Sequence, residues 1–385
     1  MRLLYLDFLR IIAFLLIIFC HVSNEMFLKY GYYPNFFKFT SNGQFGVAIF
    51  VILSGCCLAI TRKDSKLNFI DTLLFYCKRI IKLLPAYWIA IIFAIIIIFI
   101  SSGDVVIGSS FTKILISILG MDGYLLKPTF PTYYVYVGEW FIGFILIMYL
   151  IFPLLHYLLS KFPIPTLIAC FLISYFFDYI SPVITKSEFV FWNPSSTWNP
   201  LVRLSDFAIG ITIGLIIGNK LQKEKLIHGV ILLWLIICLV KNEFRIFENQ
   251  LPSPEGYLFF SVQIWASSLF FIIYFLNKIF NNKKKAITSQ ENTNSQKSVI
   301  IPFFSNYSFQ AFLIHHVLVW LFINKVPYHE PYFSLSNFWM ISISTIVTSY
   351  LLGYLITICS KDISDYLYKK CSLFITKYLS QFCNF

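Results

Sequence analysis

Long apolar runs recur along the whole chain, and this pattern restricts its fold more than any other feature. A helix needs about 20 apolar residues to cross a hydrocarbon core of roughly 30 Å. Hydrophobic residues make up 58% of the sequence and charged residues only 12%, so a protein interior cannot bury all the apolar surface and lipid must cover the rest. We predict an all-α, polytopic membrane helix bundle with about 10 transmembrane helices. The predicted spans are 6–23, 45–61, 80–100, 138–159, 165–181, 203–219, 226–241, 257–277, 299–323 and 338–359.

The basic residues indicate how these spans are oriented. With the N-terminus inside, the cytoplasmic segments hold 21 of the 30 Lys and Arg residues and the outside segments hold 9. Basic residues resist translocation, so this split predicts that both termini are cytoplasmic. The formal net charge of +12 is spread between the apolar runs and is not gathered into one patch. We therefore expect no nucleic-acid partner.

The remaining sequence leaves no room for a second folded domain. We predict a single transmembrane domain over residues 1–385, a flexible cytoplasmic loop at 278–298 and a cytoplasmic tail at 360–385. The loop is rich in Asn, Lys, Ser and Gln, a composition typical of disordered connectors. A shorter amphipathic segment near 112–120 is expected to lie outside the membrane or to re-enter it.

Neither the N-terminus nor the cysteines suggest processing or cross-linking. No small-residue cleavage site follows the first apolar run, so we expect it to be retained as a helix. The nine cysteines show no C-x-x-C pair and no metal-ligand spacing. We interpret them as small buried hydrophobic residues and expect no metal site.

Ionisable residues in the first apolar run are the first indication of chemistry, because charges inside a membrane helix are costly unless paired or hydrated. Asp7, Arg10 and His21 all lie in this run. Arg10 and His21 are eleven residues apart, so a helix places them on one face within roughly 20° and about 16 Å apart along its axis. Two other interpretations remain open, namely that Arg10 extends to the lipid headgroups and that His21 only packs in the core.

Six segments, in order, give the chain a resemblance to a known family. The spacing of Arg10 and His21 in LDFLRIIAFLLIIFCH resembles the signature of the acyltransferase-3 family, integral membrane proteins that acylate cell-surface glycans. The other five segments are GVAIFVILSGCCLAI (46–60), KRIIKLLPAYW (78–88), GEWFIGFILIMYLIFPLL (138–155), RLSDFAIGITIGLIIG (203–218) and YSFQAFLIHHVLVW (307–320). The resemblance implies an acyl-CoA donor, usually acetyl-CoA, bound from the cytoplasm, and a glycan acceptor on the far side.

The resemblance makes His21 and Arg10 the expected catalytic residues. Acyl transfer to a hydroxyl needs a base to remove the proton, and His is the commonest choice near neutral pH. No G-x-S-x-G motif supplies a serine nucleophile, so we favour direct transfer, with an acyl-histidine intermediate left open. Arg79 and Lys82, followed by Tyr87, are expected at the CoA phosphates, although the two cations suit positive-inside anchors nearly as well.

Five further residues are candidates for substrate binding, each with a structural alternative. For Ser54 we favour a close helix contact, and for Arg203 a local ion pair with Asp206. Glu139 suits a helix cap as well as a glycan contact. Trp140 suits the aromatic belt at the membrane surface. His315 matches the family position or packs, whereas His316 is expected to face elsewhere on its helix.

The sequence thus predicts an O-acetyltransferase of a bacterial cytoplasmic membrane, multi-pass and surrounded by lipid. Its partners are expected to be acyl-CoA and an extracytoplasmic or lipid-linked surface polysaccharide, while the acceptor, the acyl group and the oligomeric state stay open. One alternative is a glycan or lipid-linked transporter or flippase without acyl-transfer chemistry, although no internal repeat supports it. A second alternative is a catalytically silent subunit of a glycan-synthesis complex.

Overall fold

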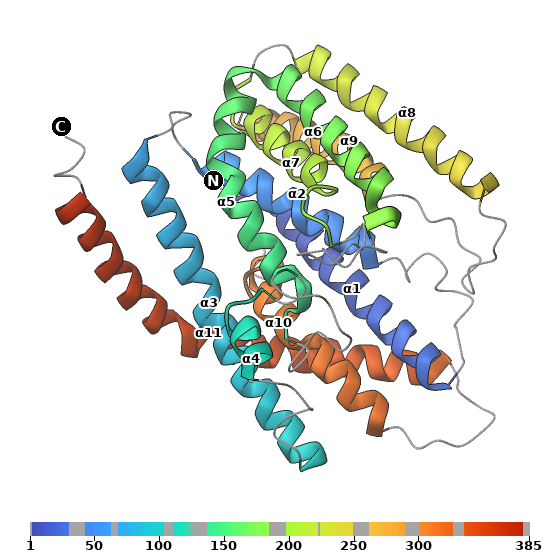
Figure 1. The fold of residues 1–385 in the computed structure, drawn as a ribbon, viewed down its shortest axis with the longest axis vertical. Coiled ribbons are helices and arrows are strands. Elements are labelled where there is room, and N and C mark those ends of the chain that lie inside the picture. The colour runs from blue at the N-terminus through green and yellow to red at the C-terminus, as the bar shows by residue number, and fades with distance from the viewer. Residues whose placement is uncertain are drawn as a thin grey trace.

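The chain forms a bundle of helices. A computed structural model describes residues 2–30, 43–62, 68–103, 111–121, 124, 137–184, 198–221, 224–248, 262–288, 300–325 and 335–379. Within these ranges there are eleven α-helices, one π-helical turn and no strand (Figure 1). The helices are α1 (Leu4–Tyr30), α2 (Gly43–Thr61), α3 (Phe69–Ser102), α4 (Phe111–Ile118), α5 (Glu139–Lys161), α6 (Pro163–Ile184), α7 (Leu204–Ile217), α8 (Glu224–Glu248), α9 (Val262–Thr288), α10 (Ile300–Lys325) and α11 (Leu335–Phe374), and the π-helical turn η2 is Ile375–Leu379.

The described part of each predicted span overlaps a helix, and the prediction of an all-α, polytopic membrane bundle is confirmed. Residues 257–261 and 299 of two predicted spans lie outside the described ranges. Among the described residues, eight helices are long and apolar enough to cross a bilayer, namely α1, α2, α3, α5, α6, α9, α10 and α11. Helix α7 is apolar but only 14 residues long. The amphipathic segment near 112–120 forms the short helix α4.

Two helices run further than the sequence suggested. Helix α9 continues to Thr288, so the first part of the predicted loop at 278–298 is helical, and residues 289–298 lie outside the described ranges. Helix α11 spans 40 residues. The predicted tail at 360–385 is therefore helical, in α11 and then η2, as far as Leu379. Lys has a helix propensity only slightly below that of Ala. A polar, Lys-containing segment can therefore continue a helix, and its composition alone does not show where the helix ends.

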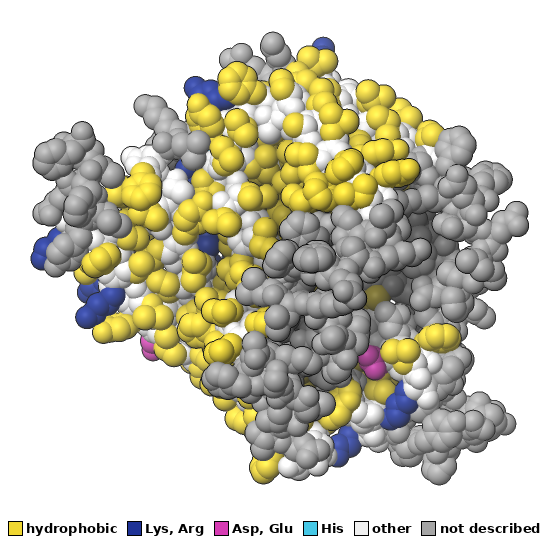
Figure 2. All heavy atoms as spheres, in the orientation of Figure 1, with side chains coloured by type: hydrophobic (Ala, Val, Ile, Leu, Met, Phe, Trp, Pro, Cys, Tyr) yellow, Lys and Arg dark blue, Asp and Glu magenta, His cyan; other side chains and the backbone are white. Residues whose placement is uncertain are grey.

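The most buried helices of the described bundle are α2, α7 and α10, with α1 packed against α2 and α10. Helix α1 packs against α2, α10 and α11, and α2 packs against α7. Figure 1 shows α3 beside the C-terminal half of α11, with α6 to α9 grouped at the opposite side of the bundle and α5 between α3 and that group. Large apolar side chains such as Leu172, Leu233 and Phe275 are exposed on the outside, and Figure 2 shows hydrophobic side chains over much of one face. A surface of this kind suits lipid rather than water.

Glycines bring α2 and α7 into close contact. A Cβ atom at Gly55 would lie 2.7 Å from the carbonyl oxygen of Phe207, and one at Gly214 would meet the backbone of Cys56. Gly210 faces the backbone of Ile52 in the same way. Small residues let membrane helices approach until their backbones touch, so the spaced glycines of 203–218 fix how α7 packs on α2.

One pair of cysteines departs from our expectation. Cys77 on α3 and Cys371 on α11 form a disulfide, with their Cα atoms 6.8 Å apart. We had interpreted all nine cysteines as buried hydrophobic residues. The two partners are 294 residues apart in sequence, so no local spacing pattern could pair them.

Candidate functional site

Arg10 lies in a polar cluster where α1 meets α10. Its Nη1 atom donates to Asp7 Oδ1 at 3.1 Å and to Ser305 Oγ at 2.8 Å. Ser305 Oγ in turn donates to the same Asp7 oxygen at 2.7 Å. Asp7 and Ser305 are almost fully buried, and a buried charge persists only when it is paired and hydrogen-bonded. Asp7 and Ser305 together hold the Arg10 guanidinium in one position.

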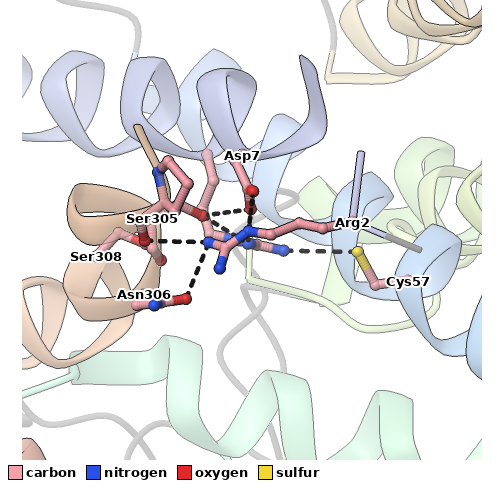
Figure 3. Close-up of polar contacts among 8 residues, drawn as sticks. Arg2, Asp7, Cys57, Ser305, Asn306 and Ser308 are labelled. Atoms are coloured by element: carbon pink, nitrogen blue, oxygen red, sulfur yellow. Dashed lines mark hydrogen bonds and ion pairs between the residues drawn. The ribbon is translucent and has the colours of Figure 1, made fainter. Parts of the chain in front are cut away.

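A second cation completes this cluster (Figure 3). Arg2 Nε donates to the other carboxylate oxygen of Asp7 at 2.5 Å, and Arg2 Nη2 donates to Asn306 Oδ1 at 3.0 Å. The free end of the Arg10 guanidinium points at Cys57 Sγ, 3.5 Å away on α2. Asp7 therefore joins two arginines, and Arg10 connects α1, α2 and α10.

A cavity of about 370 Å³ opens beside Arg10. Arg10 from α1 and Arg79 and Lys82 from α3 place three cations in its wall, and no Asp or Glu is among its lining residues. Within the described part of the chain neither Arg79 nor Lys82 forms a salt bridge. The lining is otherwise apolar and hydroxyl-bearing, with Ser54 and Tyr149 among its members. A wall of this kind attracts a polyanion that carries an apolar or amide-bearing arm.

Two residues of the cavity wall each have a buried polar atom without a hydrogen bond in the described structure. Among the described residues, the buried Nε of Arg79 and the buried side-chain oxygen of Gln310 make no hydrogen bond. The Arg79 guanidinium lies over the rings of Phe75 and Tyr149, at 5.4 and 6.0 Å from their centroids. Buried polar atoms without partners are rare in folded proteins, so both groups are suited to contact a bound ligand.

His21 lies in a cluster of three histidines. Its ring centroid is 5.1 Å from that of His315 and 4.4 Å from that of His316, both on α10. His316 Nε2 also approaches Glu25 Oε1 at 3.6 Å. Our expectation that His316 faces elsewhere was wrong, because α10 presents two adjacent residues to the side of α1. Among the described residues, no group of three His, Cys, Asp or Glu side chains is placed to hold a metal ion.

The cavity and the histidine cluster lie along the same pair of helices. Arg10 contacts Ser305 of α10, and His21 contacts His315 and His316 of α10. Helix α1 is continuous from Leu4 to Tyr30, so eleven residues separate the two groups by about 16 Å along its axis. The predicted shared face of Arg10 and His21 is therefore present, and it is the face that meets α10.

The other predicted site residues are divided between this region and the rest of the bundle. Ser54 lines the cavity, and the close contact expected of it is made by its neighbour Gly55. Tyr87 does not line the cavity, and its hydroxyl donates to the Ser117 carbonyl at 2.6 Å. It therefore ties α3 to the end of α4.

Two of the residues predicted to bind the substrate, Trp140 and Arg203, contact other side chains of the bundle. Trp140 stacks on Trp198, with ring centroids 5.6 Å apart. Arg203 is fully buried and pairs with Asp206 at 3.1 Å, which is the ion-pair alternative. Glu139 begins α5, and its side chain lies outside the described part.

Comparison with known proteins agrees with this arrangement. A family model described as an acyltransferase domain matches residues 3–358. The chain belongs to the acyltransferase-3 family. Acyltransferase MdmB from Streptomyces mycarofaciens is 26% identical over 232 residues, covering 56% of this chain and 58% of the relative. This acyltransferase-3 chain thus spans a little over half the length of that curated relative, and no solved structure matches it.

Several residues of this acyltransferase-3 site were missed by sequence reasoning. Asp7 is three residues before Arg10, a spacing that pairs charges on a helix, so its role was available from the sequence. Ser305, Gln310 and Tyr149 carry no such signal, because each reaches the cavity only through the packing of distant helices.

Proposed function

We propose that this protein is a membrane O-acyltransferase that moves an acyl group, acetyl in the first instance, from cytoplasmic acyl-CoA to a hydroxyl of an extracytoplasmic or lipid-linked surface polysaccharide. The proposal places it in a bacterial cytoplasmic membrane with both termini inside. The observation that carries it is the arrangement of helices α1 and α10 in an acyltransferase-3 chain, which contribute both to the wall of a cavity lined by three cations and to a histidine cluster.

The cavity fits the donor. CoA carries phosphates at one end and a long amide-bearing arm that ends in the thioester. Arg79 and Lys82 would pair with the phosphates, because guanidinium and ammonium groups form charge-assisted hydrogen bonds with phosphate oxygens. Gln310 offers a buried side-chain oxygen without a hydrogen bond in the described structure, which suits an N–H group of the arm. Arg10 lies about 16 Å from His21, so it is a donor-positioning residue and does not reach a thioester placed at His21.

The histidine cluster supplies the chemistry of the transfer. His21 takes the proton of the acceptor hydroxyl while the hydroxyl oxygen forms a bond to the acyl carbon. The carbon–sulfur bond then breaks, and its electron pair stays on sulfur. The CoA thiolate takes the proton from His21 and leaves as the thiol, so His21 is neutral again at the end. The step as written needs no metal and no covalent enzyme intermediate.

The decisive experiment measures ester-linked acetate on purified surface glycan, released by mild alkali. Cells carry no copy of the protein, the unmodified protein, His21→Ala or His228→Ala, at matched abundance in the membrane. His228 is the control, because it packs against Phe270 and Tyr274 away from the cavity.

The proposal is supported if glycan acetate requires the unmodified protein, is retained with His228→Ala and is lost with His21→Ala. Equal acetate with His21→Ala overturns the role of His21 and favours the silent-subunit alternative. Acetate that never changes, while export of the glycan does, overturns acyl transfer in favour of the transporter.

A further inference from the structure

Three phenylalanines lie where the donor cavity ends. Phe50 on α2 and Phe141 on α5 line the cavity. Phe312 on α10 contacts both, with ring centroids 5.8 Å from Phe50 and 5.2 Å from Phe141. Phe50 and Phe141 also contact each other, at 6.2 Å. The rings come from three helices and close into a triangle.

The ring of Phe312 also contacts the histidine cluster. Its centroid lies 5.2 Å from that of His315, with the rings nearly parallel at 29°. His315 in turn contacts His21 at 5.1 Å, and its Nδ1 lies 2.5 Å from the Phe312 carbonyl oxygen. A continuous series of contacts therefore leads from the cavity wall through Phe312 to His21.

We propose that Phe50, Phe141 and Phe312 form an aromatic partition between the donor cavity and the histidine cluster, and that this partition sets the size of the acyl group that can be transferred. The inference rests on the proposed function. It goes beyond that function by naming the residues that select the acyl chain.

The physical reason lies in the packing of the partition. Phe141 and Phe312 are almost fully buried, and Phe312 packs against Phe141 on α5 and His315 on its own helix. Close-packed interiors respond to a change of even one methylene group. An acetyl group adds only a methyl beyond the thioester carbonyl, whereas each further methylene must displace a ring. One methylene too many in an apolar pocket costs about tenfold or more in discrimination.

The experiment compares acyl-CoA molecules of increasing length. Full-length protein in lipid nanodiscs is titrated with CoA, acetyl-CoA, butyryl-CoA and hexanoyl-CoA, and the Kd of each is measured for the unmodified protein, Phe312→Ala and Phe141→Ala. The matched control is Phe171→Ala, which removes an equally buried ring that stacks on Trp234 at 4.7 Å. The Kd of CoA itself, which has no acyl group, reports whether each variant is folded and keeps its cavity.

We expect the unmodified protein to bind acetyl-CoA about tenfold or more tightly than hexanoyl-CoA. Phe312→Ala, at a residue that does not line the cavity, should reduce that ratio to near one while the Kd of CoA stays unchanged. Phe141→Ala should reduce the ratio as well, and Phe171→Ala should leave it as it is. If Phe312→Ala does not fold, Phe141→Ala and Phe312→Leu provide the same comparison.

Two results would overturn the inference, and they are distinguishable. If the variants bind CoA normally and keep the unmodified length profile, the three rings are packing only, and the proposed function stands. If the unmodified protein binds neither CoA nor any acyl-CoA, the proposed function fails, and the partition fails with it.

Discussion

The rings of His21 and His316 lie 4.4 Å apart, although the two residues belong to the first and the second-to-last membrane helices. The contact brings a carboxylate into range, because Glu25 Oε1 lies 3.6 Å from His316 Nε2. Glu25 is one turn beyond His21 on α1. His316 therefore lies between Glu25 and His21, so Glu25 and His316 are positioning residues for the proposed base.

This relationship predicts a graded loss of activity. His21→Ala should lower the rate of acyl transfer by about 10²- to 10⁴-fold, the usual contribution of a general base. Glu25→Gln and His316→Gln should lower it by smaller factors and leave the Kd of acyl-CoA unchanged, because neither residue lines the cavity. Glycan acetate over time and acyl-CoA binding to nanodiscs measure the two effects. Full activity in both variants would show that the contact is packing.

The cations of the cavity predict a salt-dependent affinity for the donor. Arg79→Gln and Lys82→Gln should each weaken acyl-CoA binding by about tenfold or more, since a hydrogen bond between charged groups contributes about 1.5–3 kcal/mol. Lys29→Gln is the charge-matched control, because its amine bonds to the Ile323 carbonyl at 3.1 Å far from the cavity. Isothermal titration at two salt concentrations measures the Kd of acyl-CoA for each variant. If Lys29→Gln weakens binding as much as Arg79→Gln and Lys82→Gln do, the prediction is wrong.

The carboxylate of Asp7 predicts a loss of stability. It accepts hydrogen bonds from Arg2, Arg10 and Ser305, and Asp7→Asn removes the charge that compensates two arginines. We expect a cost of about 1–3 kcal/mol, the usual penalty for a buried polar group left without its partner. Thermal unfolding in detergent is the measurement. Asp71→Asn, at an exposed position in the first turn of α3, serves as the control, and equal melting temperatures would refute the prediction.

The contact between α2 and α7 predicts different outcomes for two glycines. Gly55→Ala places a Cβ atom 2.7 Å from the Phe207 carbonyl oxygen, and overpacking of this kind costs about 1–3 kcal/mol. Gly229→Ala meets nothing within 4 Å and should be neutral or slightly stabilising, because Ala favours helix over Gly. Gly55→Ala should therefore lower the melting temperature, whereas Gly229→Ala should leave it unchanged or raise it slightly.

The buried pair of Arg203 and Asp206 predicts that Arg203 acts through stability. Both side chains are fully buried, so Asp206→Asn should cost about 3–5 kcal/mol by leaving a charge unpaired. Replacing both residues, with Arg203→Met and Asp206→Leu, should restore most of that loss. The double variant should keep its glycan acetate. An inactive double variant with a normal melting temperature would instead give Arg203 a direct role with the substrate.

The sequence predicted what depends on local periodicity. The helical repeat placed Arg10 and His21 on one face, and apolar runs located all ten helices that carry the predicted spans. The partner of that face was not predictable, because Ser305 reaches Arg10 across 295 residues of sequence. The same reason explains Tyr87, whose bond to Ser117 depends on how α4 folds back on α3.

Two pairs of adjacent helical residues show what the helical rotation can and cannot predict. A helix turns each residue by about 100°, which suggested that His315 and His316 could not share a target. In the structure both rings reach His21, because side chains of this length cover a broad sector of the helix surface. For Ser54 and Gly55 the same rotation separates the roles, with the glycine against α7 and the serine at the cavity.

Helices α1 and α10 contact each other at two separate places. Arg10 and Ser305 make one contact, and the histidines make the other. A donor that prefers one placement of α1 against α10 thereby changes the affinity for the acceptor, and the acceptor must change the affinity for the donor by the same factor. Where both substrates favour the same placement of the two helices, each raises the occupancy of the other.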